Sequence, residues 1–142
     1  MHVSAKAEYA IRALAELAVA SGPVTGATIA ASQRTPTRFT LNILNLLRQR
    51  GLVASRRGTG GGYVLARDPE EITVAEVIRA VEGGPLLVIR GESPEHLAYS
   101  GPADGLGDVW RAAQAGLASV LEVVTIADLA LARVPAHGRV PT

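Results

Sequence analysis

The segment from residue 35 to residue 65 constrains the fold of this chain most strongly. Thr35-Pro36 predicts the start of a helix, with Thr35 as its cap and proline in the first turn, and Gly51 predicts its end. Two short apolar stretches follow, 52–55 and 63–65, on either side of the sequence RRGTGGG. This order predicts a helix followed by a two-stranded hairpin with a glycine-rich tip.

Two more helices are expected before this unit. Ser4 can cap a first helix that Gly22-Pro23 ends, and Thr25 or Thr28 can cap a short second helix. Helix, turn and helix followed by a basic hairpin is the order of a winged helix-turn-helix. The predicted fold is therefore mainly α-helical, with the small β-hairpin as its wing.

The second half of the chain predicts a different organisation. Thr73 and Glu76 form a capping box for a fourth helix, closed by Gly83-Gly84, and Thr125 caps a short last helix. Residues 85–107 are rich in proline and glycine and show no helical period, so they predict a loop before a long helix. Loops of this length are usually functional or mobile. The predicted division is a DNA-binding domain at 1–84, a sensor-type loop at 85–107, a dimerisation helix with the short final helix at 108–134, and a disordered tail at 135–142.

The long helix carries an apolar stripe that suggests self-association. The stripe consists of Val109, Ala113, Gly116, Val120 and Val124. Four small helices cannot cover it completely, so a second copy of the chain is the expected partner, in a homodimer. The alternative is that the helix folds back on its own winged domain.

The charge distribution points to a polyanionic partner. Residues 17–67 contain seven arginines and no acidic residue, although the whole chain has a net charge of only +1. Residues 68–142 compensate, with eleven acidic residues against five arginines. An ordinary solvated surface mixes both signs, whereas an arginine-rich face without carboxylates suits the binding of phosphates. With the predicted fold, the expected partner is double-stranded DNA.

The third helix offers candidates for reading bases. Such helices contact bases mainly with residues near their N-terminus, which favours Thr37, Arg38, Leu41 and Asn42. Arg38 can donate two hydrogen bonds to guanine, and Asn42 can pair with adenine or hold a phosphate. Leu41 can meet a thymine methyl group, or it is an ordinary core leucine.

The glycine-rich turn resembles a phosphate-binding loop only superficially. Such a loop opens a helix, whereas a strand follows here, and the lysine of a Walker loop is absent. Glycines at a hairpin tip instead permit positive φ and close approach to a nucleic-acid backbone. Arg56, Arg57 and Gly58 are therefore candidate wing contacts to the minor groove or to its flanking phosphates.

Composition excludes several classes of site. With no cysteine the chain has no disulfide, no thiolate metal site and no zinc finger. No signal-peptide core and no membrane-spanning run is found, which predicts a cytoplasmic protein that does not bind membranes. His96, beside Glu92 and Glu95, is the one internal histidine; a metal ligand is conceivable there, but a solvated loop histidine is the simpler interpretation. We expect no enzymatic activity.

Several stretches together match a known family. They are Ser4-Ala5-Lys6 with Tyr9-Ala10, Pro36 through Leu47, the wing sequence RGTGGGY at 57–63, and Trp110 with the TIADL sequence at 125–129. The chain resembles the Rrf-type winged helix-turn-helix regulators of bacteria. The resemblance implies a homodimeric transcription factor that binds a palindromic operator, with Arg38 and Leu41 at base-reading positions and Arg57-Gly58 at the wing contact.

The chain departs from the cluster-binding members of that family. Those members hold three cysteines in the segment corresponding to 85–107, and this chain has none. Glu8 occupies a position where some members supply a non-cysteine ligand, but one carboxylate cannot hold an iron–sulphur cluster, and Ser93 and Ser100 are weak donors. We expect no cofactor. A small-molecule effector or a protein partner then acts instead, with Glu8, Ser93, His96 and Ser100 as candidate effector residues.

The function expected from the sequence is sequence-specific transcriptional regulation, as a homodimeric repressor. The alternative is a regulatory interaction protein that acts mainly by binding a partner enzyme.

Overall fold

Helix α1 (Ala5–Val19) is the element around which most of the other helices pack. The computed structural model describes residues 2–134. As predicted, Ser4 caps α1, its hydroxyl accepting a hydrogen bond of 3.0 Å from the backbone N–H of Ala7. Small and aliphatic side chains form the buried face of the helix: Ala7, Ala10, Ala13, Leu14 and Leu17. The alanines allow three helices to approach α1 closely: α3 (Thr37–Gln49), α4 (Val74–Glu82) and α6 (Ile126–Ala130).

Helices α2 (Gly26–Gln33) and α3 (Thr37–Gln49) form the helix-turn-helix. Thr25, rather than Thr28, caps α2. The predicted cap of α3 was wrong, because Pro36 takes the capping position without a side-chain hydrogen bond. The Thr35 hydroxyl instead lies 2.6 Å from that of Thr40, and its backbone N–H closes the turn after α2.

The wing is an antiparallel hairpin of β1 (Val53–Arg56) and β2 (Gly62–Leu65). Its register runs from Val53 opposite Leu65 to Arg56 opposite Gly62, so each strand lies slightly nearer the tip than predicted. The segment before α2 joins the hairpin. Val24 and Tyr63 exchange backbone hydrogen bonds of 3.0 and 2.8 Å, which fix the wing to the helix-turn-helix.

Two short backbone hydrogen bonds join distant parts of the chain below α1. The N–H of Val74 donates to the carbonyl of Val124 at 2.9 Å, and the N–H of Ile126 donates to that of Ile72 at 2.8 Å. They bring together the starts of α4 (Val74–Glu82) and α6 (Ile126–Ala130), which both pack on α1. The 3-10 turn η1 (Pro69–Glu71) precedes α4.

The predicted capping box of α4 is only half formed. The Thr73 hydroxyl accepts a hydrogen bond from the backbone N–H of Glu76, but the Glu76 carboxylate pairs with Arg67. The complete box lies on α6, between Thr125 and Asp128. The backbone N–H of Thr125, donating to the carboxylate, lowers the pKa of Asp128.

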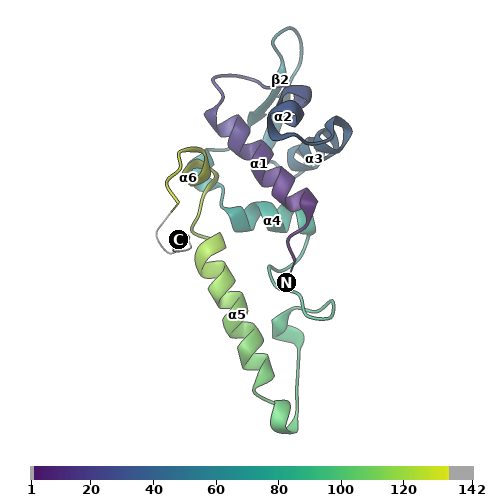
Figure 1. Ribbon diagram of the computed structural model, residues 1–142, viewed down its shortest axis with the longest axis vertical. Helices are drawn as coiled ribbons and strands as arrows, with labels where there is room; N and C mark the ends of the chain where they lie inside the picture. The colour runs from purple at the N-terminus through teal and green to yellow at the C-terminus, as the bar shows by residue number, and fades with distance from the viewer. Residues whose placement is uncertain (1, 135–142) are drawn as a thin grey trace.

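Helix α5 (Leu106–Leu121) extends away from the wing at the opposite end of the molecule (Figure 1). It begins two residues before the predicted position, and the loop that leads to it contains the 3-10 turns η2 (Pro94–His96) and η3 (Gly101–Ala103). The indole N–H of Trp110 donates to the hydroxyl of Tyr99 at 3.0 Å, which holds one face of α5 to this loop. No helix within 2–134 is long and apolar enough to cross a membrane.

The opposite face of α5 is open to solvent. Val109 is 54% exposed, and Ala113 and Gly116 are exposed as well. The predicted stripe was wrong at its end, because Val124 lies beyond α5 and is buried in the core beside Val74. One face of α5 thus folds back on its own chain, as the alternative expected, and the other is uncovered; the homodimer stays a prediction. The predicted tail at 135–142 lies outside the described residues.

The close approach of the wing to Val24 requires glycine at position 62. Gly62 has φ of +149°, and a Cβ atom there would lie 2.5 Å from the backbone carbonyl of Val24. We predict that Gly62→Ala lowers the free energy of unfolding by about 2–4 kcal/mol, measured by urea denaturation.

Gly60→Ala is the matched control for that substitution. Gly60 also has positive φ, but nothing lies within 4 Å of the added methyl group. Its cost should be only about 1–2 kcal/mol, from the left-handed backbone alone. Equal losses for the two variants would contradict the importance of the Val24 contact.

Candidate nucleic-acid interface

One face of α3 is buried and its opposite face is open to solvent. The buried residues are Thr40, Ile43, Leu44 and Leu47. The exposed face carries the four residues that the sequence predicted for base reading: Thr37, Arg38, Leu41 and Asn42. Because α3 is amphipathic in this sense, its outer face can enter a groove of DNA without losing core contacts.

Leu41, which the sequence left open as a base contact or a core leucine, is partly exposed and partly packed. Its side chain is 41% exposed on the outer face of α3. Its inner part packs over Gly26 of α2, where a Cβ atom would overlap Leu41 Cδ2. The absence of a side chain at Gly26 therefore lets α2 and α3 approach each other while part of Leu41 stays accessible.

Polar side chains fix the orientation of α2 relative to α1. The guanidinium of Arg12 donates to the side-chain oxygen of Gln33 at 2.9 Å and also to its backbone carbonyl. The carboxylate of Glu16 accepts hydrogen bonds from Ser32 and Gln33. Arg12 and Glu16 lie one turn apart on α1. Their hydrogen bonds therefore hold the end of α2 at two successive turns of α1.

The tip of the wing presents positive charge on a glycine-rich backbone. Arg56 ends β1, and Arg57 and Gly58 begin the turn; all three are exposed. Gly58 has φ of +94°, and its carbonyl accepts a hydrogen bond of 2.9 Å from the N–H of Gly61. The turn is thus closed by its own backbone, and the arginine side chains are left free to bind a ligand.

The seven arginines of the acid-free segment fall into two groups. Three are engaged: Arg48 donates to Asn45, Arg50 to the carbonyl of Ala80, and Arg67 to Glu76. The hydrogen bond to Glu76 raises the pKa of Arg67 above its ordinary value. The other four, Arg34, Arg38, Arg56 and Arg57, are exposed and form no side-chain hydrogen bond or ion pair with any residue in 2–134.

Arg34 stands at an unusual backbone position. It follows α2 with φ of 55° and ψ of 47°, the left-handed conformation that glycine adopts most readily. The turn of the helix-turn-helix therefore carries a free positive charge on a residue whose backbone conformation is unfavourable for any amino acid with a Cβ atom. The charge run indicated this arginine, but sequence alone gave no signal of its backbone conformation.

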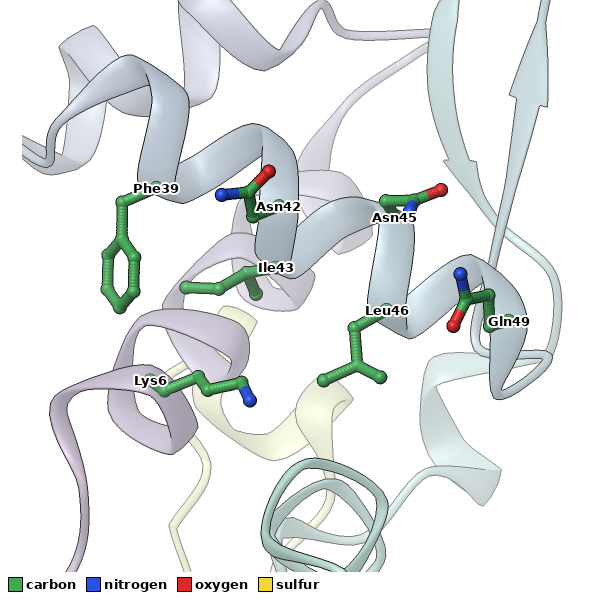
Figure 2. A pocket seen from close by; sticks show the side chains of 7 residues that line it. All are labelled: Lys6, Phe39, Asn42, Ile43, Asn45, Leu46 and Gln49. Carbon is green, nitrogen blue, oxygen red and sulfur yellow. The ribbon is translucent and has the colours of Figure 1, made fainter.

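A groove of about 420 Å³ runs along the flank of α3 (Figure 2). Phe39, Ile43 and Leu46 project from α3 toward α1, and Lys6 extends from α1 toward Leu46 (Figure 2). Asn42, Asn45 and Gln49 line the outer edge of the groove. Sequence reasoning gave Lys6 no place beside this face, because only the packing of α1 against α3 brings it there.

The four candidate effector residues do not form one site within the chain. Glu8 lies on α1 and pairs with Arg12 at 3.9 Å, whereas Ser93 and Ser100 precede η2 and η3. His96 is 72% exposed and lies 3.8 Å from Glu92. Over the residues that the structure describes, no three histidine, aspartate or glutamate side chains are close enough to hold a metal ion together.

An iron–sulphur cluster does not fit the donors that are present. The chain contains no cysteine, and the Ser93 hydroxyl already caps η2 through the N–H of Glu95. The serine and carboxylate oxygens are hard donors and lie on separate elements, so the thiolate set of such a cluster is missing.

Comparison with known proteins identifies the same family over nearly the whole chain. The model of the Rrf2 family, described as iron-dependent transcriptional regulators, matches residues 3–132. A protein of Mycobacterium tuberculosis named in the class of HTH-type transcriptional regulators is 47% identical over 139 residues, covering 96% of this chain and 86% of its own. The HTH-type transcriptional regulator CymR of Bacillus subtilis is 31% identical, with 92% and 90% covered.

Solved structures agree with these sequence matches. The structure of CymR, the global cysteine regulator of B. subtilis, superposes with a TM-score of 0.76 at 30% identity and covers 93% of this chain and 98% of its own. That of IscR from T. potens has a TM-score of 0.75 at 30% identity and covers 100% and 94%. The chain therefore belongs to the Rrf2 family of DNA-binding transcriptional regulators.

Proposed function

We propose that this protein is a sequence-specific repressor that binds a palindromic operator as a homodimer. Its effector, in this proposal, is a small molecule or a partner protein, and no iron–sulphur cluster is involved. The observation that carries the proposal is the set of four free arginines, Arg34, Arg38, Arg56 and Arg57. They occur in a segment without a carboxylate, on the turn after α2, on α3 and on the wing, and these elements face DNA in this proposal.

We call the turn after α2, helix α3 and the wing, residues 34–65, the reading head, and its parts have different roles in this proposal. Helix α3 enters the major groove, where Arg38 donates to guanine and Asn42 pairs with adenine, while Leu41 contacts a thymine methyl group. The wing follows the backbone, with Arg56, Arg57 and Gly58 at the minor groove or its flanking phosphates. Thr37 and Arg34 hold phosphates beside the major groove.

The open face of α5 is the proposed dimer contact. Val109, Ala113 and Gly116 are exposed there, and Val123 just beyond the helix is 48% exposed. Small side chains allow two helices to approach closely, and a two-fold axis would give two reading heads for two half-sites. The proposed division then keeps residues 1–84 as the DNA-binding domain and 85–134 as the sensor and dimerisation region, of which α6 packs on α1.

Arg38 and Arg57 should differ in the way they affect DNA binding. We expect Arg38→Ala to relax base preference at one position of each half-site, with a loss of about 1–3 kcal/mol for the preferred base. Arg57→Ala should weaken binding to all sequences alike and reduce the salt slope by about 1. Mobility shifts of operator and scrambled DNA over a salt series measure both effects. Equal affinity of the wild type for operator and scrambled DNA would overturn the proposal.

Arg34→Gly should separate folding from DNA binding. Glycine relieves the left-handed backbone, so the free energy of unfolding should stay constant or rise by up to about 1 kcal/mol. DNA affinity should fall, because one free guanidinium is lost from the reading head. Arg34→Lys keeps the charge and should retain most of the affinity. Wild-type DNA affinity in Arg34→Gly would remove this residue from the interface.

A charge on the open face of α5 should break the dimer. Ala113→Glu would place a carboxylate on each side of the contact. We expect the dissociation constant of the dimer, measured by sedimentation velocity, to rise by at least about tenfold. Ala98→Glu adds the same charge at an exposed alanine of the preceding loop and should leave the dimer intact. A wild-type protein that sediments as a monomer would contradict the proposed homodimer.

A further inference from the structure

A pocket of about 290 Å³ lies where the end of α4, the loop after it and α5 meet. Arg79 of α4, Glu95 of η2, and Arg111 and Gln114 of α5 supply its polar lining, and Pro85, Leu86 and the alanines of α5 supply the apolar part. In Figure 1 this is the region where the segment that follows α4 runs beside α5. Its volume lies just below the range for sites of drug-sized molecules, roughly 300–1,000 Å³, and so suits a smaller ligand.

Gln114 provides the first indication of a ligand. Its side-chain oxygen is buried, and within 2–134 it is the one buried side-chain oxygen or nitrogen without a hydrogen-bond partner. Burying a carbonyl without a donor costs about 1–3 kcal/mol, so such atoms are normally paired. The missing partner is an N–H or O–H group, and Gln114 is one of the residues that line the pocket.

The charged groups around the pocket specify the rest of the ligand. Arg79 pairs with Glu122 and Arg111 with Asp108, each through one terminal nitrogen, so other N–H groups of both guanidinium ions remain available. The carboxylate of Glu95 has no hydrogen bond or ion pair with any residue that the structure describes. The pocket therefore offers donors for an anion and, separately, a free acceptor for a cation.

From these groups we infer that the pocket binds a small zwitterion of the amino-acid class. The ligand carboxylate is held by Arg79 and Arg111, and its ammonium donates to Gln114 Oε1 and to Glu95. A simple carboxylate would leave Glu95 and Gln114 unpaired, and a simple cation would face two arginines. Only a molecule with both charges satisfies all four side chains.

A bound zwitterion would also join the sensor region to the DNA-binding domain. Arg79 belongs to α4, which packs on α1, whereas Arg111 and Gln114 belong to α5. This regulatory step rests on the proposed function, because it assumes that α5 forms the dimer and that DNA affinity is the output. Binding of the ligand itself does not depend on that assumption.

Calorimetric titration of the full chain without DNA tests the binding. The probes are the twenty common L-amino acids, followed by the N-acetyl and carboxamide derivatives of any that bind. We expect at least one to bind, and each derivative to bind at least about tenfold more weakly, since one charge-assisted contact is lost. If no amino acid binds, Gln114 is satisfied by water and the inference is wrong.

Two variants locate the site. Gln114→Met keeps the volume of the side chain and removes the buried acceptor. Glu95→Gln removes the free carboxylate from an exposed position, and we expect it to leave folding unchanged. Both should weaken binding by at least about tenfold. Glu92→Gln, in the same loop but outside the pocket, should bind as the wild type does. Unchanged affinity in Glu95→Gln would overturn the site even if Gln114→Met failed to fold.

Mobility shifts with and without the bound amino acid then test the regulatory step. A change in operator affinity that is lost in Glu95→Gln supports it. Ligand binding without any change would refute the regulatory step alone, and absent operator binding with intact ligand binding would refute the proposed function alone.

Discussion

The buried face of α1 is the contact on which the rest of the structure depends. Its alanines at positions 7, 10 and 13 leave room for the backbones of α3, α4 and α6, so three helices from distant parts of the sequence share one support. The hydrogen bonds of Arg12 and Glu16 to Gln33 then fix α2 on the same helix. Helix α3 and strand β2 also contact α1, so the reading head is held by α1 as well as by the contacts between its own elements.

The arginines of the acid-free segment are divided by the fold into paired and unpaired side chains. Three of the seven arginines in the acid-free segment are bound by the acidic half or by backbone and side-chain oxygens, and four remain exposed and unpaired among the described residues. If these four arginines formed ion pairs, the surface that carries them would be close to neutral. Because they are unpaired, the electrostatic potential of that surface stays positive. A net charge of +1 for the chain gives no indication of this division.

Most of the reading head could be predicted from the sequence, because its signals are local. Capping at Ser4, the amphipathic pattern of α3 and the glycines of the wing each depend on residues close together in the chain. The wrong predictions have non-local causes: Thr35 bonds Thr40 instead of capping α3, Glu76 turns to Arg67, and Val124 joins the core through Val74. The pocket at Gln114 depends on three separate segments, and no local pattern marks it.

The backbone hydrogen bonds between residues 72–74 and 124–126 close residues 75–123 into a loop. Helix α4 at the start of this loop packs on α1, so both ends of the part that follows α4 are fixed, and lengthening or shortening that part changes the entropy of chain closure only slightly. The folding of the reading head therefore depends little on the length of the segment beyond α4. Substitutions within that segment leave the contacts of α1 with α3, α4 and α6 in place, so the same head can fold with a different segment beyond α4.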